Sequence, residues 1–203
     1  YRPQKSDPYR IRITVGGDRI EFNDETYTPT ADITTGKTLF NSVVSTPGSK
    51  FLGIDISDFY LMTTMDDPEY MWMPRWIFPQ AFIDEYNLEP LFINDRILTK
   101  IIGGMYGLPQ AGRLAYIDLI KFLQCYGYVR AGLTPGLFKH ITRPTIFSLV
   151  VDDFGVKYNS INDALHLINT LKIRYKITVD WEGSIFCGIH LNWNYQQGEV
   201  TLS

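Results

Sequence analysis

An apolar stretch that runs directly into two adjacent aspartates is the feature that most constrains this chain. Residues 147–156 read FSLVVDDFGV, so Asp152 and Asp153 lie between two runs of strand-forming residues. Two carboxylates in apolar surroundings are unfavourable unless a cation neutralises them. Tight hairpin turns favour Asp-Gly or Asn-Gly, so an ordinary turn accounts poorly for an Asp-Asp pair. The pattern therefore predicts a β-hairpin whose tip binds a divalent metal ion.

A second apolar stretch ends in an acidic residue in the same way. Residues 50–56 read KFLGIDI, with Asp55 between two isoleucines, as a buried strand requires. If the two strands are brought together, Asp55 joins Asp152 and Asp153 in a carboxylate cage for two Mg²⁺ ions, with Mn²⁺ as the alternative. Taken alone, Asp55 has a second interpretation, because an aspartate at the end of a strand often caps a backbone group.

Periodicity and turn residues predict the remaining elements. Residues 9–22 alternate around a Gly-Gly-Asp turn and predict a β-hairpin, whereas prolines predict irregular structure over 57–98 apart from one short helix. We expect helices at 35–44, 80–86, 111–126 and 160–175, and strands at 50–56, 145–151, 154–158, 184–193 and 199–202. From residue 50 to 193 the order then reads β-α-β-β-α-β, a ferredoxin-like arrangement of the α+β class in which the three aspartates meet.

The composition bounds the class of protein. With 203 residues, 45% of them hydrophobic, the chain suffices for one large globular domain. A net charge of −3 argues against a stand-alone nucleic-acid binder, whose affinity for phosphate is mostly cationic. No apolar run reaches membrane-spanning length, no signal peptide is recognisable, and we expect a fragment because the chain does not open with Met. The cysteines and histidines lack the spacing of a zinc site: Cys125, Cys187, His140, His166 and His190.

Five short motifs resemble, in the same order, those of reverse transcriptases, and their form is near to that of copia-type LTR retrotransposons. Residues 55–60 (DISDFY) resemble the first palm motif, residues 105–112 (MYGLPQAG) the second, and residues 151–153 (VDD) the third. Residues 186–189 (FCGI) match the position of the primer-gripping hairpin, and residues 5–10 (KSDPYR) resemble the fingers loop. Val150 stands where the third motif usually has an aromatic residue, which leaves the candidate metal ligands intact.

The resemblance implies a right-hand polymerase palm, an α+β fold of ferredoxin-like βαββαβ topology, with a fingers subdomain. Residues 1–203 would form one reverse transcriptase domain. Its fingers would comprise residues 1–49 and 61–104, and its palm residues 50–60 and 105–203. The palm would end near the primer grip, and most of the thumb would be absent.

The resemblance also implies roles for single residues. Asp55 and Asp152 would bridge the two Mg²⁺ ions, and Asp153 would assist the site. Tyr60 would lie under the sugar of the incoming dNTP and exclude a 2′-hydroxyl, and Gln110 would contact the nucleotide near its sugar. Ordinary interpretations stay open, namely a tyrosine of the core and a polar residue in the first turn of a helix.

Further residues would contact phosphates or the primer. Lys5 and Arg10 would bind the triphosphate, with Arg12 as the alternative register, although a solvated strand face explains the same basic residues. Lys176, which has other cations close by in the sequence, is the candidate general acid that protonates pyrophosphate. The primer grip would consist of Phe186, Cys187 and Gly188.

The implied activity is RNA-directed DNA synthesis, in which dNTPs extend the 3′-hydroxyl of a primer. The expected partners are an RNA or DNA template with its primer and dNTPs, with no membrane, and the sequence indicates no oligomeric state. The cytoplasm is the expected location, with a virus-like particle and the nucleus as alternatives. One rival is a domesticated or decayed copy that only binds nucleic acid or protein. The other is a different palm enzyme such as a nucleotide cyclase, against which Tyr60 and the motif at 105–112 argue.

Overall fold

The computed structural model of the chain describes residues 13–203. The candidate phosphate-binding residues Lys5, Arg10 and Arg12 lie outside this part of the chain. Residues 13–32 hold a single 3₁₀ helix, η1 (Gly17–Arg19), so the hairpin expected at 9–22 is wrong as far as it is described. The reason is the close approach of this segment to the loop that contains Gly107. A Cβ at Gly17 would lie 1.8 Å from the carbonyl oxygen of Gly107, so the segment packs against another loop instead of folding back on itself.

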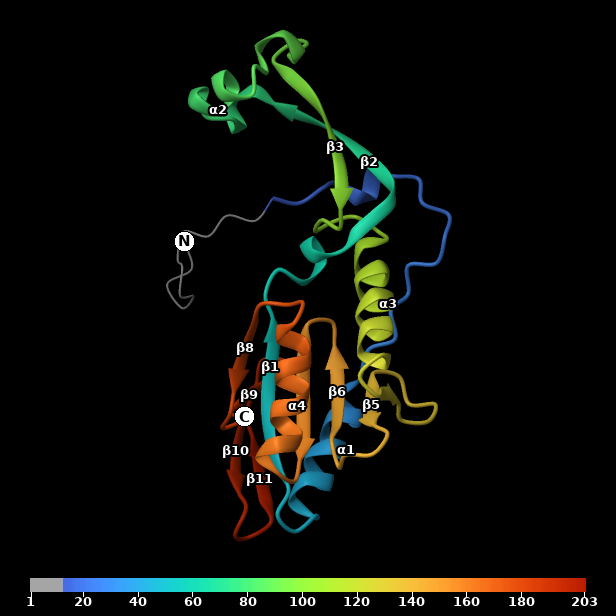
Figure 1. The fold of residues 1–203 in the computed structure, drawn as a ribbon, viewed down its shortest axis with the longest axis vertical. Coiled ribbons are helices and arrows are strands. Elements are labelled where there is room, and N and C mark those ends of the chain that lie inside the picture. Colours follow the sequence, from blue (N-terminus) through green and yellow to red (C-terminus); the bar gives the residue numbers. More distant parts are fainter. Residues whose placement is uncertain (1–12) are drawn as a thin grey trace.

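A six-stranded antiparallel sheet forms the centre of the molecule (Figure 1). Its strands lie in the spatial order β4-β5-β6-β7-β1-β8. Along the chain, β1, α3, β6, β7, α4 and β8 give the order β-α-β-β-α-β. The strands are β1 (Lys50–Ile56), β4 (Tyr128–Arg130), β5 (Leu137–His140), β6 (Ile146–Val150), β7 (Asp153–Tyr158) and β8 (Ile177–Asp180).

Helices α3 (Ala111–Gln124) and α4 (Ile161–Lys172) cover one face of this sheet and form the main hydrophobic core with it. Alternate residues of β1, among them Leu52 and Ile54, point into that core because side chains of a strand alternate between its faces. The Ser160 side chain caps α4 by accepting a hydrogen bond from the backbone N–H of Asp163.

The opposite face carries α1 (Ile33–Val44) and a three-stranded sheet of β9 (Ile185–Phe186), β10 (Ile189–Asn194) and β11 (Glu199–Leu202). Phe40, Phe51, Phe186 and Trp193 pack together there, with ring centroids 5.0–6.1 Å apart. The single strand expected at 184–193 is therefore wrong. That segment is a hairpin, because Cys187 and Gly188 both adopt positive φ, and the short strand β8 takes the place beside β1.

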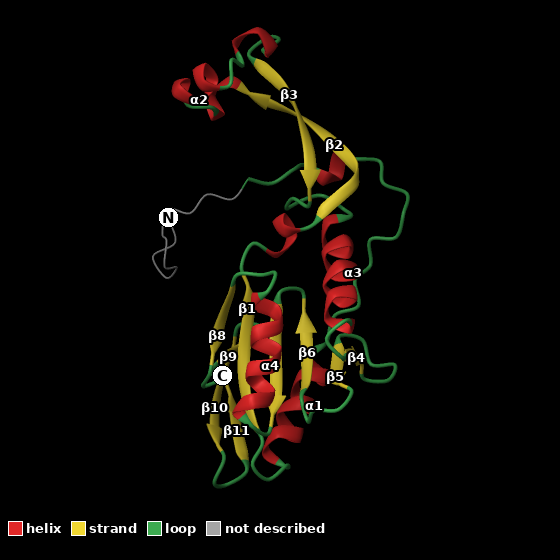
Figure 2. Ribbon diagram, viewed as in Figure 1, coloured by secondary structure: helices red, strands yellow, loops and turns green. Residues whose placement is uncertain are grey.

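The remaining strands, β2 (Thr64–Pro74) and β3 (Arg96–Gly103), form a hairpin that projects beyond the end of the main sheet (Figure 1). It follows η2 (Phe59–Met62) and carries η3 (Arg75–Ile77), α2 (Gln80–Glu85) and η4 (Glu89–Leu91) at its far end (Figure 2). The expectation of irregular structure over 57–98 is thus wrong. The prolines interrupt no ladder: Pro68 lies in a bulge, Pro74 ends β2 and Pro79 precedes α2.

Two further findings concern the organisation of the chain. Helix α1 packs on the main sheet, mainly against β1 and β6. The sequence analysis instead assigns residues 1–49 to the fingers, together with residues 61–104, which form the projecting β2–β3 hairpin. Among the helices of residues 13–203, none combines the length and the apolar character that crossing a membrane requires.

Candidate active site

The three aspartates of the sequence motifs come together at one end of the main sheet. Asp55 and Asp153 are direct partners in the β1–β7 ladder, so their side chains emerge on the same face. The backbone N–H of Ile56 donates to the carbonyl oxygen of Asp152 at 3.1 Å, which ties the β6–β7 turn to the end of β1. The face that they share is the one that also carries the β9–β10 hairpin.

The negative charges of these three aspartates repel one another. The pKa of Asp153 is raised to about 6, first by burial and then by the negative charges of Asp152 and Asp55. Carboxylate oxygens are the ligands that Mg²⁺ prefers, so these three side chains are of the right chemical type to bind this ion. Among residues 13–203, however, no group of three or more His, Cys, Asp or Glu side chains is already arranged around a metal position.

The turn that carries the aspartate pair is strained. Only Val151 and Asp152 connect β6 to β7, and Val151 adopts a φ of 59°. A β-branched residue is unfavourable in this left-handed region, where tight hairpins normally use Gly or Asn. Strain of this kind persists only where the surrounding structure imposes it, and it is concentrated at functional sites.

The candidate primer-grip residues lie directly beside the aspartates. The ring of Phe186 is buried against the sheet, and a Cβ at Gly155 would lie 3.0 Å from it, so this approach depends on a glycine. Cys187 is an exposed turn residue whose thiol contacts the Asp153 carboxylate. Partial burial of the sulfur and the charges of Asp153 and Asp152 raise the pKa of this thiol to about 12.

Tyr60 and Gln110 both lie at the start of α3. The Tyr60 ring lies 5.3 Å from that of Tyr106, centroid to centroid, and a Cβ at Gly112 would lie 3.7 Å from the Tyr60 hydroxyl. The side-chain amide of Gln110 donates to a Glu69 carboxylate oxygen at 3.0 Å. The sequence analysis assigned no role to Glu69, because one acidic residue in a stretch expected to be irregular does not indicate which side chain it contacts.

Lys176 lies one residue before β8, at the same end of the sheet as Asp55. Its carbonyl oxygen accepts a hydrogen bond from Ser57 at 2.9 Å, and its side chain is exposed. Its neighbour Arg174 is engaged elsewhere, in an ion pair with Asp118 of α3. Asp180, at the end of β8, accepts hydrogen bonds from three backbone N–H groups of residues 182–185 and from the Ser184 hydroxyl, and this holds the start of the β9–β10 hairpin.

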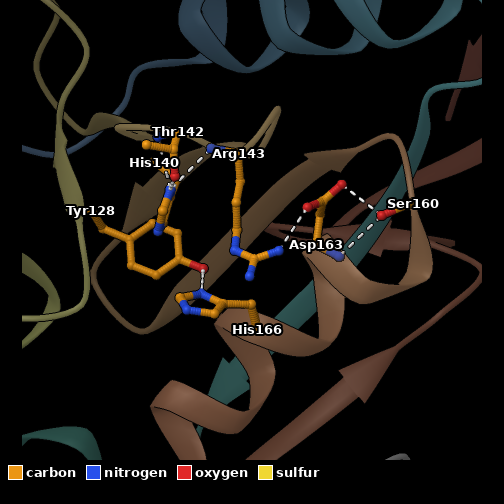
Figure 3. Close-up of polar contacts among 7 residues, drawn as sticks. All are labelled: Tyr128, His140, Thr142, Arg143, Ser160, Asp163 and His166. Atoms are coloured by element: carbon orange, nitrogen blue, oxygen red, sulfur yellow. Dashed lines mark hydrogen bonds and ion pairs between the residues drawn. The ribbon is translucent and has the colours of Figure 1, made fainter.

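Two of the histidines, His140 and His166, belong to a polar cluster with Tyr128 and Arg143 (Figure 3). The Tyr128 hydroxyl and His166 Nδ1 are 2.9 Å apart, and His140 Nδ1 accepts backbone N–H groups of residues 142 and 143, each at 3.1 Å. Arg143 bridges the cluster to Asp163 at 3.1 Å. The Nδ1 atom of His140 is therefore occupied as an acceptor within this cluster.

An open groove of about 640 Å³ lies at the other end of β1. It is lined by Lys50, Trp181 and Tyr195 among others, whereas none of the three aspartates takes part in it. Lys50 and Asp55 stand at opposite ends of one strand, so the groove and the carboxylates are separate features.

The fold and the site thus define a protein of mixed helices and antiparallel sheets, with three carboxylates at one end of the main sheet. No family model matches the chain. It is similar to a Saccharomyces cerevisiae protein described as "Putative transposon Ty5-1 protein YCL074W", with 26% identity over 158 residues. The match covers 74% of this chain and 45% of that relative, so the chain spans less than half of the relative's length. The similarity, although distant, indicates a retrotransposon origin.

Proposed function

We propose that this chain is the fingers–palm region of a retrotransposon reverse transcriptase, an RNA-directed DNA polymerase. The observation that carries the proposal is the pairing of Asp55 with Asp153 and the attachment of Asp152 beside them. The order of elements β-α-β-β-α-β and the distant similarity to a transposon protein support the same function. A binding protein has no evident use for two carboxylates that add to the raised pKa of a third, Asp153, whereas a two-metal polymerase needs such a group.

In the proposed reaction, Asp55 and Asp152 hold two Mg²⁺ ions and Asp153 assists them. Bound Mg²⁺ supplies Lewis acidity that favours deprotonation of the primer 3′-hydroxyl and neutralises charge on the triphosphate. The protein contributes the positions of the reactants. Lys176, at the same end of the sheet, would be the donor of a proton to the leaving pyrophosphate.

The remaining residues would align nucleotide and primer. Tyr60 lies against the start of α3, where its ring would support the sugar of a dNTP and leave no room for a 2′-hydroxyl. Phe186, Cys187 and Gly188 would hold the primer end over the carboxylates, since the Cys187 thiol already contacts Asp153. Lys5, Arg10 and Arg12 remain candidates for the triphosphate.

Primer extension on a primed RNA template with dNTPs and Mg²⁺ tests the proposal. We expect extension by the parent chain and a loss of at least about 10²-fold in Asp152→Asn, because the amide cannot replace an anionic metal ligand. Gln80→Ala, at the far end of the β2–β3 hairpin, is the control that should retain activity. Failure of the folded parent, and of longer versions that include a thumb, would overturn the proposal.

A nucleic-acid or protein binding module is the second candidate, and the net charge of −3 is compatible with protein binding. This candidate predicts binding of partners without metal-dependent extension. A gel-shift assay with the same primed template, run beside the extension assay, separates the two functions.

A further inference from the structure

The projecting β2–β3 hairpin has one covered face and one open face. Side chains of a strand alternate between its two faces, and the members of a cross-strand pair share a face. Burial follows this alternation along β3, where every second side chain is exposed: Arg96, Leu98, Lys100 and Ile102. On β2, Tyr70 pairs with Lys100 and Trp72 pairs with Leu98, so both aromatic rings lie on the same open face.

The middle of this open face is apolar. Tyr70 is 60% exposed, Trp72 47%, Leu98 49% and Ile102 65%. Because the hairpin projects beyond the main sheet, another molecule can approach the face (Figure 1). A two-stranded hairpin is only marginally stable in water, and a contiguous exposed apolar patch marks an interaction site. The open face therefore calls for a partner that covers it.

Opposite charges stand at the two ends of the open face. Arg96 pairs with Pro74 at the far end of the hairpin. Asp66 and Asp67, both exposed, lie at the near end, where the register of β2 shifts. At the usual rise of a strand the two ends are about 20–25 Å apart, with the apolar side chains between them. Within residues 13–203, no ion pair involves any of these three charged residues.

We propose that the open face is an interface between two copies of this chain, stacked face to face about a two-fold axis. An axis that runs across the strands, between Tyr70 and Trp72, reverses the direction of the second hairpin. The basic end of each copy then faces the acidic end of the other, and each Tyr70 lies over the Trp72 of the other copy. An axis along the strands would instead place like charges together, which opposes association.

The proposal adds an assembly surface to the chain and does not depend on polymerase activity. Two strands per copy make a small interface, so we expect a weak dimer with a Kd on the order of 10 µM. Sedimentation velocity over a range of about 1–100 µM brackets this value and should show a monomer that converts to a dimer as its concentration rises.

Leu98→Arg tests the apolar middle of the interface. The variant brings two cations together beside the axis, so the Kd should rise at least about thirtyfold. The matched control is Leu133→Arg, which adds the same charge to the connection between β4 and β5. Leu133 is 102% exposed, and its substitution should leave the Kd unchanged.

Charge reversal tests the orientation of the two copies. Arg96→Glu should raise the Kd about tenfold, because a carboxylate then faces the acidic end of the other copy. Adding Asp66→Lys and Asp67→Lys to the same chain should restore dimerisation. Within one copy the two ends are too far apart to pair, so this rescue requires contact between copies. These exposed positions tolerate substitution, and circular dichroism checks that each variant is folded.

Three results would overturn the proposal. One is a folded parent that stays monomeric up to about 100 µM, because the face is then covered by another segment or partner. The second is a triple charge-reversal variant that dimerises no better than Arg96→Glu. The third is a Leu98→Arg variant that binds primed template more weakly while its Kd for dimerisation is unchanged, because the face then binds nucleic acid.

Discussion

In the absence of metal, the aspartate group should destabilise the folded chain, and Asp153→Asn should remove this cost. Folding raises the pKa of Asp153 from 3.8 to about 6. Such a shift lowers the free energy of unfolding at neutral pH by at most about 3 kcal/mol, and partial exposure to solvent reduces this loss to about 1–2 kcal/mol. Because Asn cannot ionise, the variant should gain that amount, or about 5 °C in Tm for a chain of this length.

The pKa shift also determines how the destabilisation by Asp153 changes with pH. The folded state binds the Asp153 proton more tightly than the unfolded state does, so the penalty is absent below the unfolded pKa of 3.8 and complete above about pH 6. The stability difference between variant and parent should therefore be largest near pH 7.5 and fall to roughly half at pH 5.

Thermal unfolding of both proteins in EDTA, followed by circular dichroism across this pH range, measures the effect. Asp24→Asn, at an exposed position, controls for loss of an ordinary surface charge. Added Mg²⁺ should stabilise the parent and narrow the difference. Equal stability of Asp153→Asn and parent, or a difference that does not change with pH, would refute the electrostatic reasoning.

Two further predictions concern specificity and the hairpin. Tyr60→Ala should admit ribonucleotides at least about tenfold better than the parent, whereas Tyr60→Phe keeps the ring and the exclusion; equal rNTP use by all three proteins would contradict the role of the ring. Asp180→Ala removes the acceptor of four hydrogen bonds that hold the start of the β9–β10 hairpin. It should cost about 1–3 kcal/mol in urea unfolding and raise KM for template–primer more than KM for dNTP; a rise in both alike would contradict a role in holding the primer.

Elements with strong periodicity were predictable from the sequence, and those decided by tertiary contacts were not. Helix α3 and strands β1, β6 and β7 follow from apolar repeats and strand-forming runs. Strand β8, with the sequence ITVD, is too short to be recognised without its partner β1. The β2–β3 hairpin was hidden by prolines, whose effect depends on whether they fall inside a ladder or at its ends.

The same distinction applies to the site. That Asp55 and the Asp152–Asp153 pair would meet followed from two strand ends and a turn, and the ladder register pairs Asp55 with Asp153. Glu69 was not predictable, because its orientation depends on a bulge that only the pairing of β2 with β3 defines. Sequence patterns identify candidate residues that would act directly, such as metal ligands. Residues that orient other side chains can be identified only once the fold is known.

Several local costs of this fold lie at or near the candidate site. The left-handed Val151 and the repelling carboxylates are at the tip of the main sheet, and the buried side-chain oxygen of Gln110, unpaired among residues 13–203, is at the start of α3, which packs against η2 just beyond β1. Each is unfavourable for the isolated chain; a bound cation would relieve the repulsion between the carboxylates, and a hydrogen-bond donor would satisfy the Gln110 oxygen. A fold under selection for stability alone has no reason to keep these features so close together. Bound nucleotide and Mg²⁺ should therefore stabilise this chain more than either alone, which follows from linkage between binding and folding.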